Sequence, residues 1–353
     1  MSSPTSSPYL SIVVSGRNDN YGGDFERRLQ RFVDRLTYLI EKYQLPTELL
    51  LVNYNPLADR PGLEQMIQWP AGRRHLRIRM ITVPPDVHRQ FIDPSIRKTL
   101  PFFEFVAKNI GLRRATGAFI LATNADILFP EEMVRCWAER SLTQGCLYRA
   151  NRLDFHFRAA AADTLVAPDL EDRIAPSITR FYLQGGTFRL PWPQSIRFRL
   201  SMLHHYNQVR QWVYPRLCRT FVGRGLASQL HVRPDNLFLL QYPFNASGDF
   251  ILLDRASCQR TGAYPEDTLV AMHTDSLHLV RAMALGIPVT VLPYPIFHQE
   301  HARRFDPTKP DPAMDQMMAR LIDEFQQMKA TNTVPPQADD WGLAGQVLPE
   351  IVL

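Results

Sequence analysis

The sequence predicts an α/β fold with a mostly parallel central sheet flanked by helices. Short apolar runs alternate with amphipathic segments from residue 9 onward, which is typical of βαβ units. Polar clusters stand directly after three of the apolar runs, where parallel sheets bind ligands. The composition, with 45% hydrophobic and 21% charged residues among 353, is that of an ordinary globular protein.

Each predicted element rests on the spacing of its apolar side chains. The segment 24–43 places them at three- and four-residue steps with charged residues between them, as in a helix that packs on a core. The segment 131–140 begins just after Pro130, and proline is favoured at helix starts. We predict strands at 9–15, 48–53, 76–83, 118–123, 250–254 and 287–292, and helices at 24–43, 57–69, 99–114, 131–140, 274–285 and 311–329.

Composition divides the chain into five segments. Residues 1–8 are rich in serine and proline and are predicted to be disordered. Residues 9–150 and 246–330 carry the α/β pattern, and residues 151–245 form an insertion rich in arginine and aromatic residues. Residues 331–353 form a tail with several prolines and little periodicity.

Three absences bear on location. No run of about 18 apolar residues is present, as a membrane-spanning helix requires. The first eight residues lack the basic and apolar regions of a secretory signal. The four cysteines are far apart and form no Cys-x-x-Cys pair, which argues against a cysteine metal site. We therefore predict a reduced, cytoplasmic protein.

Positive charge is concentrated in the insertion. No acidic residue falls between Asp172 and Asp235, and the ten arginines from Arg173 to Arg233 are mixed with tryptophan and tyrosine. Four interpretations are open: a lid whose arginines pair with acids elsewhere, contact with an acidic membrane surface, a site for an anionic acceptor, or nucleic acid. Nucleic acid is the least favoured, because no recognisable binding motif is present.

The cluster Asn124-Ala125-Asp126 follows the strand predicted at 118–123. A carboxylate at the tip of a buried strand is held rigidly, and hard divalent cations prefer such oxygen ligands. Asp126 is therefore a candidate metal ligand. The alternative is that it caps the helix that begins near Pro130.

Asn109, Gly111, Ala115 and Gly117 precede this cluster at spacings typical of a known sequence block. Together with Asp126 they resemble that block in the family 2-like glycosyltransferases, whose fold is called GT-A. The family's block ends in Asp-x-Asp, and its first acid is replaced here by Asn124. The resemblance therefore implies a metal site that depends on Asp126 and a donor-binding role for Asn124. It covers about 9–140 and 246–302 and leaves the insertion unmatched. The residues that match in order and spacing are Asn109, Gly111, Ala115, Gly117 and Asp126.

A second block, from Gly248 to Glu266, resembles the acceptor side of the same family. Asp275 falls on the family's catalytic base, which takes the proton of the acceptor hydroxyl. Glu266 is the alternative base, and the alternative role for Asp275 is to cap its own helix. The resemblance further implies acceptor contacts from Gly248, Asp249 and Arg255.

Two histidines follow the last core strand. Many GT-A enzymes supply a late histidine to the metal, so the resemblance implies that His298 and His301 are ligands, for which imidazole is suited. The alternative is a surface loop with two solvated histidines. The donor- and nucleotide-binding residues that the resemblance implies are Ser15, Arg17, Asp19, Asn53, Asn109, Arg113 and Asn124.

The function implied by the resemblance is transfer of a sugar from a nucleotide diphosphate sugar to a hydroxyl acceptor, with inversion and with Mn or Mg as cofactor. The acceptor would be a glycan or a lipid-linked molecule. Residues 9–150 would then bind the donor, residues 246–330 the acceptor, and the insertion would form a lid or contact the inner membrane face. Two alternatives are open: a nucleotidyltransferase that makes the nucleotide sugar, and a degenerate GT-A module that only binds glycan or lipid.

Overall fold

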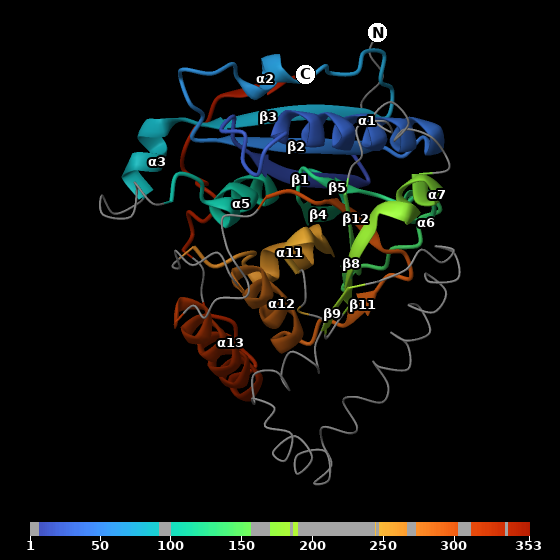
Figure 1. Ribbon diagram of the computed structural model, residues 1–353. Helices are drawn as coiled ribbons and strands as arrows, with labels where there is room; N and C mark the ends of the chain where they lie inside the picture. Colours follow the sequence, from blue (N-terminus) through green and yellow to red (C-terminus); the bar gives the residue numbers. More distant parts are fainter. Residues whose placement is uncertain are drawn as a thin grey trace.

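The computed structural model describes residues 7–91, 100–156, 170–183, 186–189, 244, 247–266, 273–302, 312–335 and 338–353. Strands and helices alternate along its first 140 residues (Figure 1). Most of the acid-free insertion lies outside the described residues, so the interpretations of it stay predictions. In the described part of the chain, no helix is long and apolar enough to cross a bilayer.

The larger of two sheets is built from eight strands. They are β1 (Leu10–Gly16), β2 (Thr47–Tyr54), β3 (Leu76–Val83), β4 (Phe119–Thr123), β6 (Leu147–Arg149), β10 (Phe250–Asp254), β11 (Val289–Val291) and β13 (Glu350–Val352). Their order in space is β11-β6-β10-β4-β1-β2-β3-β13. β1 pairs in parallel with β2 and β4, and β2 with β3, whereas β10 and β13 run antiparallel to their neighbours. The predicted mostly parallel sheet is confirmed.

Helices cover both faces of this sheet, as predicted. They are α1 (Phe25–Tyr43), α2 (Leu63–Met66), α3 (Pro85–Phe91), α5 (Glu104–Arg114), α6 (Glu131–Ala138), α7 (Leu170–Ile174), α11 (Arg255–Thr261), α12 (Thr274–Ala284) and α13 (Pro312–Thr331), with single turns η2 (Ala175–Ser177) and η3 (Ser247–Asp249). α1 and α6 share one apolar core. α5, α11, α12 and α13 share the other, and Figure 1 shows α11, α12 and α13 grouped together below the strands.

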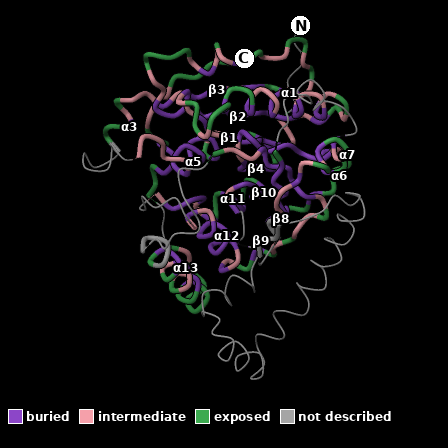
Figure 2. The backbone as a smooth tube through the Cα atoms, in the orientation of Figure 1, coloured by how far each residue is buried: buried purple, intermediate pink, exposed green. Residues whose placement is uncertain are grey.

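Alternate residues of the central strands point to opposite faces of the sheet, which therefore separates the two cores. In β1, Val13 packs in the core with α5, whereas Ile12 and Val14 pack in the core with α1. Figure 2 shows the buried layer that results along β1, β2 and β4. Strands buried on both faces must be apolar throughout, which is why these elements appear in the sequence as continuous apolar runs.

The smaller sheet carries elements that the sequence patterns did not predict. Its strands, in order across the sheet, are β5 (Ile127–Leu128), β12 (Ile296–Gln299), β7 (Arg152–Phe155), β8 (Ile178–Leu183) and β9 (Gly186–Arg189). β5 follows Asp126 directly, and β12 carries His298. The antiparallel pairing of β12 with β5 sets His298 opposite Ile127. This small sheet therefore joins two segments that are far apart in the sequence.

Two predicted elements differ in the structure. The helix predicted at 57–69 is confined to α2, because Pro61 and Pro70 restrict its ends and the Asn18 amide takes the carbonyl oxygens of Leu57, Arg60 and Pro61. The tail after residue 331 is not wholly irregular, since β13 pairs antiparallel with β3.

Candidate metal centre and active site

Asp126, His298 and His301 meet at the carboxyl end of β4. The chain leaves β4 at Thr123, turns through Asp126 and enters β5, where the pairing with β12 brings in the histidines. The backbone N–H of Gln299 donates to the Asp126 carbonyl at 3.1 Å and fixes the register at this point. One potential ligand atom from each side chain lies within 4.8 Å of the others.

Three cationic or potentially cationic groups surround one oxygen of Asp126. Arg28 Nη1 donates to Oδ2 at 2.8 Å, His301 Nε2 lies 3.2 Å from it and His298 Nε2 lies 3.8 Å from it. Asp126 is only 9% exposed. Burial raises the pKa of Asp126, but His298, His301 and Arg28 outweigh burial and hold the pKa well below its usual range. The carboxylate is therefore ionised.

The hydrogen bonds of His301 indicate which ring nitrogen carries a proton and which one faces Asp126. Its Nδ1 lies 2.9 Å from the Ala302 carbonyl oxygen, which can only accept, so Nδ1 carries the proton. Nε2 lies 3.2 Å from Asp126 Oδ2, where a protonated ring donates to the carboxylate and a neutral ring offers a lone pair. Asp126 Oδ1 is buried and has no hydrogen-bond partner among the described residues. An unsatisfied buried carboxylate oxygen, with two imidazole nitrogens close to the same carboxylate, fits a bound cation.

The structure contradicts both helix-cap alternatives, the one for Asp126 and the one for Asp275. Helix α6 has Pro130 at its N-cap and no side-chain cap, so Asp126 does not cap it. Helix α12 has His273 at its N-cap, and Asp275 lies in its first turn. His298 is 4% exposed, so it is not a solvated surface residue.

The loop before α1 packs on His301. Arg28 Nη2 donates to the carbonyl oxygens of Tyr21 and Gly23, so the same guanidinium holds Asp126 and this loop. The Gly22 carbonyl accepts from Ala302 N at 3.2 Å. A methyl group on Gly22 would lie 2.4 Å from His301 Nδ1. The loop therefore leaves no room for a side chain at this position.

We expect Gly22→Ala to weaken Mn²⁺ binding about tenfold, because it displaces a ligand support. Gly22 has φ +71°, so the change also strains the backbone and lowers the free energy of unfolding by roughly 1 kcal/mol. Gly23→Ala is the matched control, since Gly23 has φ +74° but nothing within 4 Å of the added methyl. Calorimetric Mn²⁺ titration of both variants checks this, and equal affinity in the two would contradict contact with His301.

A second polar cluster lies beside the metal ligands, around Asn124. Lys108 is fully buried and donates from Nζ to Asn124 Oδ1 at 2.7 Å and to the Gly248 carbonyl at 2.8 Å. The Asn124 amide donates to Asp249 Oδ1 at 2.8 Å. Both ends of the Asn124 side chain are thus engaged by protein groups.

Asp275 joins this cluster through Gly248. Its Oδ2 accepts from Ser247 Oγ at 2.6 Å and from Gly248 N, and its Oδ1 accepts from Ser276 N at 2.9 Å. Lys108 binds the carbonyl of the same Gly248, so the backbone of this glycine, together with Lys108, connects Asn124 to Asp275. The structure therefore brings the predicted metal ligands, Asn124, Gly248, Asp249 and Asp275 to one end of the sheet.

The predicted donor residues of the first two strands lie along the same edge. The pairing of β1 with β2 sets Ser15 opposite Val52 and Gly16 opposite Asn53. Arg17 donates from Nε to the Asn55 carbonyl at 2.6 Å and pairs with Asp19 at 3.2 Å. The convergence of three strand ends is thus present, with Arg17 and Asp19 paired to each other.

Four predicted site residues have other partners in the structure. Asn109 donates to Glu266 Oε1 at 2.8 Å, and Gly342 N donates to the same oxygen, so Glu266 connects α5 to the tail. Burial raises the pKa of Glu266. Arg255 follows β10 at the opposite edge of the sheet, because β10 runs antiparallel to β4.

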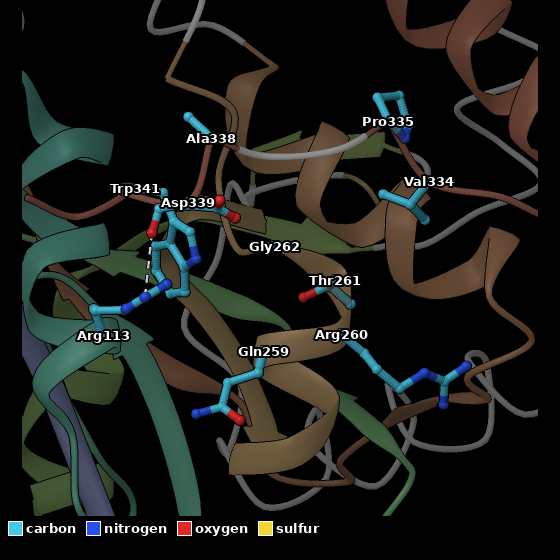
Figure 3. Close-up of a pocket in the computed structure, with 10 residues that line it drawn as sticks. All are labelled: Arg113, Gln259, Arg260, Thr261, Gly262, Val334, Pro335, Ala338, Asp339 and Trp341. Carbon is cyan, nitrogen blue, oxygen red and sulfur yellow. Dashed lines mark hydrogen bonds between the residues drawn. The ribbon is translucent and has the colours of Figure 1, made fainter. Parts of the chain in front are cut away.

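Arg113 lies in a separate pocket. Its guanidinium stacks on the Trp341 ring at 4.8 Å, and Nη2 donates to the Asp339 carbonyl (Figure 3). The pocket has a volume of about 480 Å³ and contains no residue of the metal cluster. Its lining residues are Arg113, Gln259, Arg260, Thr261, Gly262, Val334, Pro335, Ala338, Asp339 and Trp341.

Sequence reasoning missed four buried ionic residues near the metal cluster. Arg28 was assigned to the charged side of its helix, although it is 3% exposed. Arg152 and Asp154 lie in a strand of four residues, too short for an alternation signal. Of the four, only Lys108 could have been noticed in the sequence, because it is a lysine in a segment whose other residues are mostly apolar or small.

Comparison with known proteins gives no family assignment. No protein-family model matches the sequence, and no curated protein matches it. The fold is similar to the crystal structure of S. aureus TarS 1–349, with 12% identity, a TM-score of 0.41, and coverage of 92% of this chain and 73% of that one. It is also similar to GalNAc-T7 with UDP, GalNAc and Mn²⁺, with 8% identity, a TM-score of 0.42, and coverage of 92% of this chain and half of that one. TM-scores below 0.5 do not establish a common fold or function.

Proposed function

We propose that this protein is a GT-A glycosyltransferase that moves a sugar from a nucleotide diphosphate sugar to a hydroxyl acceptor, with a divalent metal as cofactor. The observation that carries the proposal is the Asp126–His298–His301 cluster, in which two imidazole nitrogens and a buried carboxylate meet at the carboxyl end of a parallel sheet. Carboxylate with imidazole suits Mn²⁺, and Mg²⁺ is the alternative.

The metal would be held by Asp126, His298 and His301, and when bound it supplies positive charge to the leaving diphosphate. The donor would lie along the edge formed by Ser15, Asn53 and Asn124. Parallel α/β sheets bind nucleotides at this edge, which supports the placement.

Asp275 is the proposed base. The acceptor oxygen attacks the anomeric carbon, the bond from that carbon to the diphosphate oxygen breaks with its electron pair, and the hydroxyl proton passes to the Asp275 carboxylate. Three hydrogen bonds, from Ser247, Gly248 and Ser276, fix the orientation of this carboxylate. A single displacement of this kind inverts the anomeric centre.

A degenerate module that binds without catalysis is the second candidate. It is favoured by Asn124, which offers an amide where the motif has a carboxylate and whose two polar atoms are already bonded to Lys108 and Asp249. Hydrolysis of UDP-glucose, UDP-galactose, UDP-GlcNAc and GDP-mannose in the presence of Mn²⁺ separates the candidates. Release of nucleotide diphosphate supports the transferase, and Mn²⁺ binding with no release from any donor contradicts it.

Mn²⁺ is expected to raise the melting temperature of the protein. A ligand at 100 times its dissociation constant adds about 2.7 kcal/mol to the free energy of unfolding. The shift should disappear in the His298→Ala/His301→Ala double variant and persist in His75→Ala, which changes a histidine outside the cluster. Thermal melts with Mn²⁺ and with EDTA measure this, and equal shifts in both variants would place the metal elsewhere.

A further inference from the structure

Asp154 is a fully buried acid next to a proposed metal ligand. The parallel pairing of β7 with β12 sets Asp154 opposite His298, so both side chains leave the small sheet on the same face. Asp154 Oδ1 lies 3.1 Å from His298 Nδ1. The two atoms are within hydrogen-bonding distance, although the orientation of the ring makes no hydrogen bond between them.

The two nitrogens of His298 face different acids. Nδ1 faces Asp154, and Nε2 lies 3.8 Å from Asp126 Oδ2. Carboxylate oxygens accept hydrogen bonds, so Asp154 at 3.1 Å favours the tautomer in which Nδ1 carries the proton. The Nε2 lone pair is then directed to the Asp126 side, as it is in His301. Both histidines would present the same nitrogen to one ion.

Arg152 holds Asp154 in place and connects it to the second polar cluster. Its Nε lies 2.8 Å from Asp154 Oδ1, and its Nη1 donates to Asp249 Oδ2 at 2.5 Å. The other oxygen of Asp249 accepts from the Asn124 amide. Both oxygens of Asp249 are thus bonded to protein groups, and its predicted contact with the acceptor stays a prediction.

We propose that Asp154 is a positioning residue that fixes the His298 tautomer and so prepares Nε2 to bind the metal, with Arg152 as the cation that orients Asp154. The inference rests on the proposed metal site. Carboxylates behind metal-bound histidines typically contribute 10- to 100-fold to metal affinity. If Asp154 served only to balance the charge of Arg152, it would contribute nothing to metal affinity through His298.

Nitrogen-15 spectra of the chelator-treated protein test the tautomer without metal and without activity. At about pH 8, above the ordinary imidazole pKa of about 6.5, long-range nitrogen–proton correlations distinguish the two neutral tautomers. We expect the proton of His298 on Nδ1 in the wild type and a mixture of tautomers in Asp154→Asn. A wild-type ring with its proton on Nε2 overturns the proposal.

Metal affinity gives the second readout. Asp154→Asn is expected to weaken Mn²⁺ binding by 10- to 100-fold. Asp254→Asn is the matched control, since Asp254 is a buried carboxylate at the far end of β10 that accepts from Ser257 N and Gly145 N. Its affinity should stay within about threefold of the wild type, and equal losses in the two variants show a general electrostatic role and overturn the proposal. If Asp154→Asn fails to fold, Asp154→Glu, which keeps the charge, is compared with Asp254→Asn in the same way.

These measurements are independent of sugar transfer. A wild type that binds Mn²⁺ and has the expected tautomer, but hydrolyses no donor, would contradict the proposed function and leave the role of Asp154 intact. Donor hydrolysis by the wild type, with no change of tautomer or Mn²⁺ affinity in Asp154→Asn, would support the proposed function and overturn the role of Asp154.

Discussion

Asp126→Ala is expected to lower Mn²⁺ affinity by at least about 100-fold and to reduce donor hydrolysis to background, because it removes the one anionic ligand of the cluster. The variant should still fold, since Arg28 keeps the Tyr21 and Gly23 carbonyls as partners. Calorimetry measures the affinity, and chromatographic detection of released nucleotide diphosphate measures hydrolysis.

Asp34→Asn is the control for this variant. Asp34 is a half-buried carboxylate on α1 that accepts from Gln30 at 2.9 Å, away from the metal cluster. Its replacement should leave both measurements unchanged. Undiminished Mn²⁺ binding by a folded Asp126→Ala protein would falsify the metal centre.

Asp275→Asn is expected to slow the catalysed step by about 10²- to 10⁴-fold, the usual contribution of a general base. The amide keeps the shape of the side chain but cannot take the acceptor proton. Mn²⁺ affinity should not change, because the contacts of Asp275 are to Ser247, Gly248 and Ser276 and not to the metal ligands. Steady-state rates at saturating donor, together with Mn²⁺ titration, provide the measurement.

Glu266→Gln distinguishes the two candidate bases. Glu266 Oε1 already accepts from Asn109 and from Gly342 N, so its replacement should affect the attachment of the tail and not the rate. A melting temperature lowered by a few degrees with a rate within about threefold of the wild type is the expected result. A larger loss of rate in Glu266→Gln than in Asp275→Asn would reverse the assignment.

The sequence was most informative for segments whose pattern fits a single kind of element. Continuous apolar runs with turns after them predicted β1 to β4, and parallel strands leave few choices for where their polar ends meet. Asp126, Asn124 and the residues after β1 and β2 were therefore predicted to lie at one edge, and the structure places them there.

The remaining features depend on contacts between distant segments. Arg28 reads as a surface residue of an amphipathic helix, and only its ion pair with Asp126, 98 positions away, explains its burial. Arg113 sits beside the matched motif in the sequence, but the helix that carries it ends at the other edge of the sheet, against Trp341. Asp154 and His298 become neighbours only through the pairing of two four-residue strands.

The pairing of β13 with β3 has a consequence for how the protein is made. β3 forms one side of the parallel strands, and its outer partner is 271 positions later, where Glu350 bonds Arg79. During synthesis, β1 to β3 can assemble long before residue 350 leaves the ribosome. The outer edge of β3 then exposes unpaired N–H and C=O groups, which are prone to pair with other chains. Nascent chains arrested before residue 350 should therefore aggregate or recruit chaperones more than chains arrested after it.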